Sequence, residues 1–168
     1  MVHGNINCLS NKVTIEPYSL DGFLAVVKTG TAVAGATSTE LVVVPKESSD
    51  SDIYTWQVAK KGSNKFAFKN LKTGKWISAR DWFWGKKVVV NKGGSTEDLG
   101  SWEYFRYAGG DCGMKKYAGT FALETAHDTY LQMKAESCSR CNNKLKYTAY
   151  QKKLTCGDEA RFSFKCID

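Results

Sequence analysis

The sequence predicts an all-β fold of twelve short strands, arranged as three repeats of four strands. An apolar pair follows a turn signal once in each repeat, with spacings of 53 and 54 residues: Phe23-Leu24, Trp76-Ile77 and Tyr130-Leu131. An aromatic segment ends each repeat, at 54–58, 101–105 and 161–164. No stretch shows a helical period with capping residues at its ends. A pattern that recurs at near-constant spacing is typical of a fold built from repeated units.

The first strand of each repeat is predicted from alternating apolar and polar residues. These alternating runs are Val13–Glu16, Phe66–Lys69 and Phe121–Glu124. Turn residues follow at 20–22, 72–74 and 127–129, and the apolar pair then begins the second strand. β-Branched and aromatic residues between turn signals are typical of short strands.

The third and fourth strands complete each repeat. We expect third strands at 40–44, 87–90 and 146–149, and fourth strands that carry Trp56, Trp102 and Phe162 as matched core aromatics. The predicted organisation is an N-terminal segment (1–12) and one domain (13–167), with repeats at 13–62, 63–110 and 111–167. A closed barrel would leave no exposed strand edges.

Composition and charge limit the function classes. The chain has 168 residues and a net charge of +7, and no apolar run approaches the length of a membrane span. No signal peptide is visible at the N-terminus. Seven basic residues and no acidic residue lie between Lys60 and Arg80. A basic surface concentrates polyanions such as sulfated glycans, although the same charge also serves solubility.

The three repeats together resemble a β-trefoil. The nearest resemblance is to fascin-like trefoils, carried by the valine-rich third strands and by the segment Trp102-Glu103-Tyr104-Phe105. The basic segment of the third repeat is similar to the loop before the last strand of fibroblast growth factors. Ricin-type trefoils carry Gln-x-Trp in each repeat, and this chain has none. The resemblance therefore implies the fold and leaves the function open.

Six cysteines allow fifteen pairings. In a closed trefoil the first and last strands are neighbours, which makes a bridge between Cys8 and Cys166 sensible. Cys112 opens the third repeat and Cys156 precedes its final strand, so these two are the second candidate pair. Cys138 and Cys141 form a Cys-x-x-Cys segment, which we expect to be structural. Bridges would indicate an oxidising compartment, whereas six free thiols would indicate the cytosol.

Catalytic chemistry is not expected from this sequence. The chain has two histidines, His3 near the N-terminus and His127 in a predicted turn. It shows no phosphate-binding glycine loop, and Cys138 and Cys141 lack the second pair that a zinc site requires. We expect no enzyme activity, no cofactor and no metal.

Two departures from the repeat are the candidate sites. Trp82-Phe83-Trp84, followed by Lys86, lies between the second and third strands of the middle repeat, as an aromatic platform or as a cap on the core. The third repeat has its longest insertion at 137–153, which we expect to be a loop that presents cations. The predicted ligand-binding residues are Trp82, Trp84, Lys86, Arg140, Lys144 and Lys146.

The predicted function is non-catalytic binding, and the first hypothesis is a lectin-like protein for a carbohydrate or an acidic polysaccharide. The runner-up is a protein-interaction module, either fascin-like and actin-binding or cytokine-like. A Kunitz-type protease inhibitor is third. Nucleic acid is not expected as a partner. We expect a secreted protein, with a cytoplasmic location as the alternative; the sequence is silent on assembly.

Overall fold

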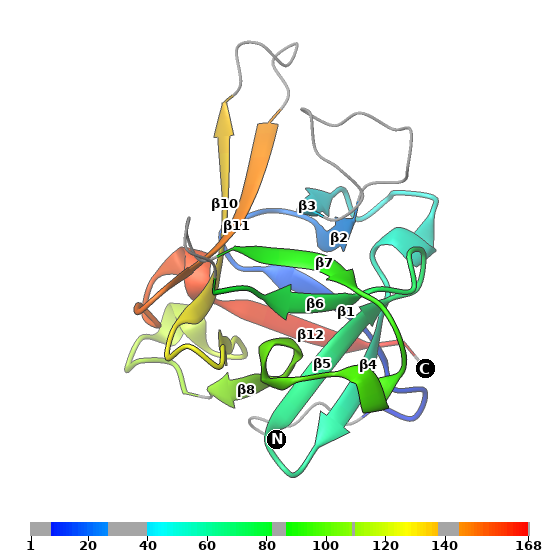
Figure 1. Cartoon of the computed structure of the whole chain (residues 1–168). Helices are drawn as coiled ribbons and strands as arrows, with labels where there is room; N and C mark the ends of the chain where they lie inside the picture. The colour runs from blue at the N-terminus through cyan, green and yellow to red at the C-terminus, as the bar shows by residue number, and fades with distance from the viewer. Residues whose placement is uncertain (1–7, 27–39, 82–86, 109, 138–144, 168) are drawn as a thin grey trace.

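The computed structural model describes residues 8–26, 40–81, 87–108, 110–137 and 145–167. Twelve strands follow one another along the chain (Figure 1): β1 (Lys12–Pro17), β2 (Phe23–Val26), β3 (Leu41–Val44), β4 (Trp56–Lys61), β5 (Lys65–Asn70), β6 (Trp76–Ala79), β7 (Val88–Lys92), β8 (Phe105–Ala108), β9 (Ala122–Glu124), β10 (Tyr130–Ser137), β11 (Leu145–Lys152) and β12 (Phe162–Cys166). Short 3-10 turns lie between strands: η1 (Ser51–Ile53), η2 (Thr96–Asp98), η3 (Ser101–Glu103), η4 (Lys115–Tyr117) and η5 (Asp158–Ala160). None of the described residues forms an α-helix.

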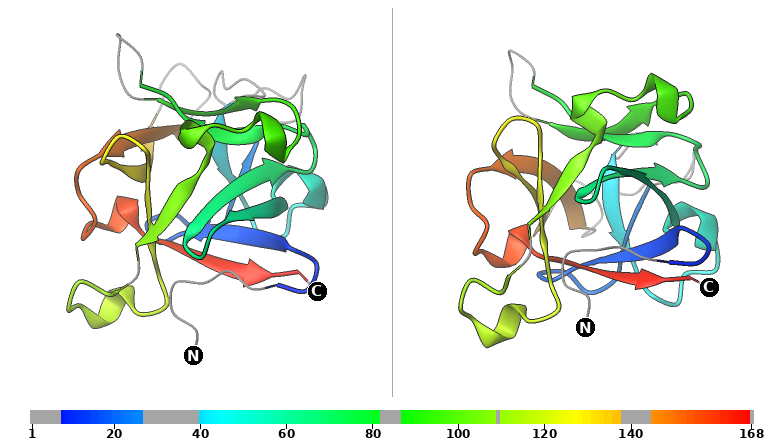
Figure 2. Two further views of the ribbon diagram at one scale, coloured as in Figure 1. Left: turned by 60° about the horizontal axis from the view of Figure 1, so that its bottom comes forward. Right: turned by 90° about the horizontal axis from the view of Figure 1, so that it is seen from below.

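Six strands form a barrel, two from each repeat. The antiparallel pairs run from β12 through β1, β4, β5 and β8 to β9. A bridge between Phe121 and Phe162 joins the β9 side to β12 and closes the ring. Figure 2 shows these strands surrounding a common centre when the molecule is seen from below. Closure pairs the edges that an open sheet would expose.

Three hairpins cover one end of the barrel: β2–β3, β6–β7 and β10–β11. Each hairpin begins at the first residue of the apolar pair, namely Phe23, Trp76 and Tyr130. The second residues of the pairs, Leu24, Ile77 and Leu131, are 0–1% exposed. The barrel and the three hairpins make the protein a β-trefoil, and the predicted fold class is confirmed.

The predicted role of Trp102 as the core aromatic of the second repeat is wrong. Trp102 lies half-buried in η3, and β8 begins three residues later, at Phe105. The matched core residues are Trp56, Phe105 and Phe162, all 0–1% exposed. The main-chain N–H of Gly100 donates to the Glu103 carboxylate (2.9 Å), which closes a turn where the sequence suggested a strand.

The third strand predicted at 146–149 is present and longer, as part of β11, so the described residues after 144 in the segment predicted as a long loop are mainly a strand. β10 extends to Ser137, and its eight residues pair in register with β11. In Figure 1 this hairpin projects beyond the other two. Alternation explains the difference, because Lys146 to Tyr150 alternate polar or charged side chains with less polar ones, a pattern that suits an extended pair.

Two disulfides join distant parts of the chain. Cys8 bonds to Cys166 and Cys112 bonds to Cys156, with Cα–Cα distances of 5.4 and 5.8 Å. Both predicted pairings are present. The first bridge ties the start of β1 to the end of β12, and the second ties the start of the third repeat to the segment before β12. No helix among the described residues has the length and apolarity to cross a bilayer.

Candidate functional site

Most of the predicted binding residues lie outside the described residues. These are Trp82, Trp84 and Lys86 in the middle repeat, and Arg140 and Lys144 in the third, with Cys138 and Cys141 beside them. Lys146 is described: it is exposed on β11 and lies opposite Glu136 of β10.

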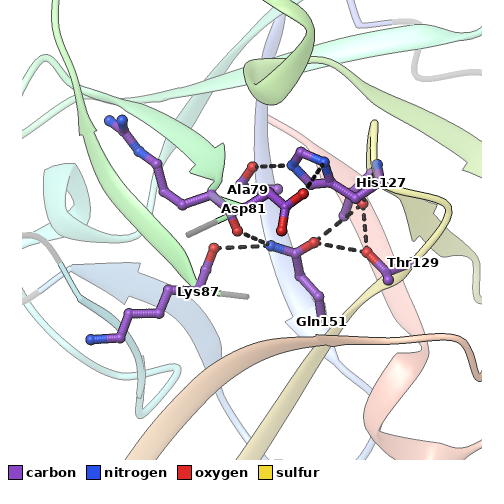
Figure 3. A network of polar contacts seen from close by, with 8 residues as sticks. Ala79, Asp81, Lys87, His127, Thr129 and Gln151 are labelled. Carbon is purple, nitrogen blue, oxygen red and sulfur yellow. Dashed lines mark hydrogen bonds and ion pairs between the residues drawn. The ribbon is translucent and has the colours of Figure 1, made fainter. Parts of the chain in front are cut away.

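The described ends of the aromatic segment are tied to the third repeat. The main-chain N–H of Arg80 donates to the carbonyl of Lys87 (2.7 Å), so the two ends of the segment lie side by side. The Gln151 side chain, from β11, donates to the carbonyls of Arg80 (2.9 Å) and Lys87 (3.0 Å). Figure 3 shows this amide bridging both ends. Gln151 is only 9% exposed, so these bonds form largely away from solvent.

The turn at 125–129 holds the same two ends of the aromatic segment, residues 79–81 and 87, which we call the stem of the β6–β7 hairpin. The Thr129 hydroxyl donates to the Gln151 side-chain carbonyl (2.8 Å), which orients the amide towards the stem. Nε2 of His127 lies 2.9 Å from the carbonyl of Ala79, and Nδ1 lies 3.6 Å from the Asp81 carboxylate (Figure 3). The segment that carries Trp82 and Trp84 therefore starts and ends on positions fixed from another repeat.

A second candidate surface is a groove of about 860 Å³ along the β4–β5 hairpin, here called the lysine groove. Its walls come from β4, from β5 and β6, and from the segment around η2. The lining residues are Asn11, Gln57, Val58, Ala59, Lys60, Lys61, Lys69, Trp76, Ser95, Thr96, Glu97, Leu99 and Tyr104.

The strand register explains the shape of the lysine groove. Along β4 and β5, the buried residues Val58 and Phe68 pair with each other and point into the barrel. The intervening pairs therefore face outward. Ala59 and Ala67 form the middle outward pair, with Lys61 and Lys65 on one side and Gln57 and Lys69 on the other. Ala59 lines the groove between the longer side chains of Gln57 and Lys61, and this small side chain leaves room for the trough.

Cations and aromatic rings border this trough. The ammonium of Lys61 lies 5.2 Å from the centre of the Tyr104 ring, and that of Lys69 lies 5.8 Å from the Trp76 ring. The Trp76 indole donates to the carbonyl of Gly94 (2.9 Å), which fixes the ring. Within the described part of the chain, no ion pair engages Lys60, Lys61 or Lys69, and Glu97 is the one acid that lines the groove.

A smaller hollow of about 290 Å³ continues the basic surface past Tyr104. Lys61 and Tyr104 line both cavities, and Lys65 and Arg106 line the second. Arg106 pairs with Glu124 (3.8 Å), so this end carries mixed charge. Anions are therefore favoured most strongly on the side of Lys60, Lys61 and Lys69.

The predicted and the observed candidate surfaces are separate. Lys146 lies on the projecting β10–β11 hairpin, whereas the lysine groove lies on the β4–β5 hairpin of the barrel (Figure 1). The residues of the groove were not predicted as a site. The available signal was the basic stretch that begins at Lys60, together with the alternation that places Lys61, Lys65 and Lys69 on one face.

Comparison with solved structures shows the same fold at low identity. A structure described as the BEL β-trefoil aligns with 98% of this chain and 99% of its own, with a TM-score of 0.63 and 13% identity. A ricin B-like lectin from Macrolepiota procera, in complex with lactose, aligns with 97% and 99%, with a TM-score of 0.58 and 7% identity. A lectin from Polyporus squamosus, bound to a sialylated influenza-binding epitope, aligns with 95% of this chain and 50% of its own, with a TM-score of 0.63 and 8% identity.

These likenesses establish the β-trefoil fold and nothing finer. Neither a family model nor a curated protein matches the sequence. At such identities, function has to be argued from the site.

Proposed function

We propose that this protein is a non-catalytic carbohydrate-binding protein, and that the lysine groove binds an acidic polysaccharide. The observation that carries the proposal is the lining of the groove. Lys61 and Lys69 lie on the outward face of the hairpin and Lys60 lines the groove beside them, Tyr104 contributes a partly exposed ring, and Glu97 is the one acid among the described lining residues. Cations hold sulfate or carboxylate groups, while aromatic rings pack against the apolar faces of sugar rings.

The shape of the groove fits an extended ligand better than a small one. It is an open trough along two strands, and it continues past Tyr104 into the second hollow. A linear glycan can place successive anionic groups along such a surface. The lactose-bound and sialoside-bound lectins share the fold, which supports a carbohydrate as the class of ligand.

The aromatic segment is proposed as a second contact with the ligand. Gln151 and His127 hold its described ends, which lowers the entropy lost when Trp82 and Trp84 bind. Lys86, Arg140, Lys144 and Lys146 remain proposed anion contacts.

We further propose that the protein acts outside the reducing cytosol. The Cys8–Cys166 and Cys112–Cys156 bridges support this location, because structural disulfides persist in oxidising compartments.

Retention on heparin tests the proposed function. The protein should elute from immobilised heparin at higher salt than from a sulfonate cation exchanger of matched charge density. A generic basic surface would elute at the same salt from both columns. Equal elution would contradict recognition of a sulfated glycan.

Paired variants test the place of binding. Lys60→Gln/Lys61→Gln should weaken binding to a heparin oligosaccharide about tenfold, since each exposed ion pair contributes up to about 1 kcal/mol. Lys115→Gln/Lys153→Gln removes the same charge from exposed positions outside the groove and should change affinity much less. Equal losses in both variants would show that net charge alone drives retention.

A glycan array with wild type and Trp82→Ala/Trp84→Ala tests the aromatic segment. Loss of signal in the variant, with unchanged thermal stability, is the expected result. A blank array for the wild type would favour the alternative function, a protein-interaction module.

A further inference from the structure

A third cavity, of about 630 Å³, lies on the outward face of β1 and β12, and we refer to it as the β1–β12 pocket. Lys12 and Thr14 of β1, Lys165 of β12 and Phe23 of β2 line it. Lys46, Tyr54 and η1 complete its wall. None of the residues predicted as ligand-binding from the sequence belongs to it.

The β1–β12 pocket is the counterpart of the lysine groove in the preceding repeat. Each cavity is bounded by the fourth strand of one repeat and the first strand of the next, β12 with β1 and β4 with β5. Each contains the first residue of the following second strand, Phe23 or Trp76. Each is completed by the segment that links the third and fourth strands. The approximate three-fold repeat therefore places two similar hollows at equivalent positions.

The lining of the pocket is cationic on one side. Lys12, Lys46 and Lys165 contribute three ammonium groups, and Asp52 is the one acid among the described lining residues. Lys46 is held by the Glu16 carboxylate (2.5 Å). The pocket thus carries more positive than negative charge even after this pair is counted.

The same pocket has an apolar wall. The rings of Phe23 and Tyr54 stack with their centres 4.6 Å apart and their planes inclined by 20°. Both rings are half-buried, so their positions are set by packing. A flat apolar wall in a pocket that is also lined by ammonium groups suits a sugar ring that carries an acidic substituent.

One residue that lines the pocket, Thr14, carries a buried hydroxyl. Thr14 is 6% exposed, and its hydroxyl has no hydrogen-bond partner within the described part of the chain. Thr14 pairs with Lys165 across the two strands, so this hydroxyl belongs to the same face as the cation. Buried polar groups without a partner are rare in folded proteins, because leaving one unpaired is costly. A ligand hydroxyl or acidic oxygen would satisfy it.

We infer that the β1–β12 pocket is a second binding site for one acidic sugar residue, either sulfated or uronic. This inference rests on the proposed function and extends it, because a chain with two equivalent sites can hold one polysaccharide at two points. Two-point attachment raises the overall affinity above that of either site when the ligand spans both.

Calorimetric titration with a short sulfated heparin tetrasaccharide tests the second site. Wild type should bind two tetrasaccharides per chain. Lys12→Gln/Lys165→Gln should bind one, as should Lys60→Gln/Lys61→Gln. The matched control, Lys115→Gln/Lys153→Gln, should still bind two. If wild type bound only one tetrasaccharide, and if only the Lys60→Gln/Lys61→Gln variant lost that binding, the second site would be overturned. The proposed function would remain intact. No binding at all would overturn both.

Thr14→Val gives a readout that does not depend on charge. Valine has nearly the shape of threonine and removes the unpaired hydroxyl, so the midpoint of thermal unfolding should rise. Affinity at the β1–β12 pocket should fall about tenfold, since one hydrogen bond to the ligand is lost. A higher unfolding midpoint with unchanged affinity at both sites would exclude Thr14 as a ligand contact.

A tetrasaccharide without sulfate and carboxylate groups tests the class of ligand. If wild type bound it with the same affinity as the sulfated tetrasaccharide, the acidic class of ligand would be overturned.

Discussion

At the residue scale, the buried carboxylate of Glu103 shapes the turn before β8. It accepts hydrogen bonds from the Ser78 hydroxyl (2.6 Å) and from the main-chain N–H of Gly100 (2.9 Å), and it is 4% exposed. Glu103→Ala should lower the free energy of unfolding by about 2 kcal/mol, because the buried Ser78 hydroxyl and the partly buried N–H of Gly100 lose their acceptor. Chemical denaturation measures this change.

Glu103→Gln is the matched control. Its amide carbonyl can still accept from Gly100, and its amide nitrogen can donate to the Ser78 oxygen. The loss should therefore be smaller than for Glu103→Ala. Equal losses for the two variants would mean that packing, and not hydrogen bonding, gives Glu103 its role.

Asp158 makes stability depend on acid pH. A hydrogen bond from the Tyr117 hydroxyl (2.6 Å), and then one from Lys116, lowers the pKa of Asp158 below its usual value of 3.8. The folded state therefore gains stability above that usual value and loses it as the pH falls through the lowered pKa. Thermal unfolding from about pH 5 to about pH 2 should show a smaller loss for Asp158→Asn than for wild type.

Glu47→Gln is the comparison for this prediction, because Glu47 is exposed and lies outside the Tyr117 and Lys116 cluster. Its acid dependence should match that of wild type. If the thermal stability of Asp158→Asn fell with pH as much as that of wild type, Asp158 would not be the cause of the acid dependence.

The outcome for single residues shows what local sequence can predict. The pairing Cys8–Cys166 follows from strand order, because a closed barrel places the first and last strands together. The pairing Cys112–Cys156 was predicted from the places of the two cysteines, at the start of the third repeat and before its final strand. Trp102 was assigned to the core in place of Phe105, because these two aromatic residues stand only three positions apart. Which of them enters the core depends on the turn that the tertiary contact between Glu103 and Ser78 stabilises.

At the scale of elements, the stem of the β6–β7 hairpin depends on the third repeat. Gln151→Ala removes both donations to the stem and the acceptor of the Thr129 hydroxyl. Hydrogen exchange at the Arg80 amide should become at least several-fold faster, because its bond to Lys87 is no longer supported. Global stability should fall by about 2 kcal/mol.

Asn91→Ala serves as the control for the stem. Asn91 is exposed and its side chain accepts from the Arg80 guanidinium, and within the described residues that side chain does not bond to the main chain of the stem. Exchange at the Arg80 amide should stay near the wild-type rate. A similar acceleration in both variants would show that Gln151 is not the specific support.

The strands were predictable because alternation and the apolar pairs are local signals. The lengths of β10 and β11 were less predictable: a strand was expected at 146–149, and the register with β10 extends it to Leu145–Lys152. The lysine groove was also beyond local reading, since it needs β4, β6 and the η2 segment together.

At the scale of the whole molecule, the two disulfides differ in the length of chain that they close. Cys8 and Cys166 are separated by 158 residues, and Cys112 and Cys156 by 44. In the chain-entropy model, Cys8→Ser/Cys166→Ser should cost about 4–5 kcal/mol, roughly 1 kcal/mol more than Cys112→Ser/Cys156→Ser. Denaturant unfolding under non-reducing conditions measures both, and a larger loss for the shorter loop would contradict the model.

The central claim is that the lysine groove binds an acidic glycan. Its most direct test is a map of backbone amide chemical shifts during titration with a sulfated heparin tetrasaccharide. The amides of Lys60, Lys61 and Tyr104 should shift in a saturable manner, whereas those of Lys115 and Lys153 should not. Saturable shifts confined to residues outside the groove, or uniform weak shifts at every exposed lysine, would contradict the claim.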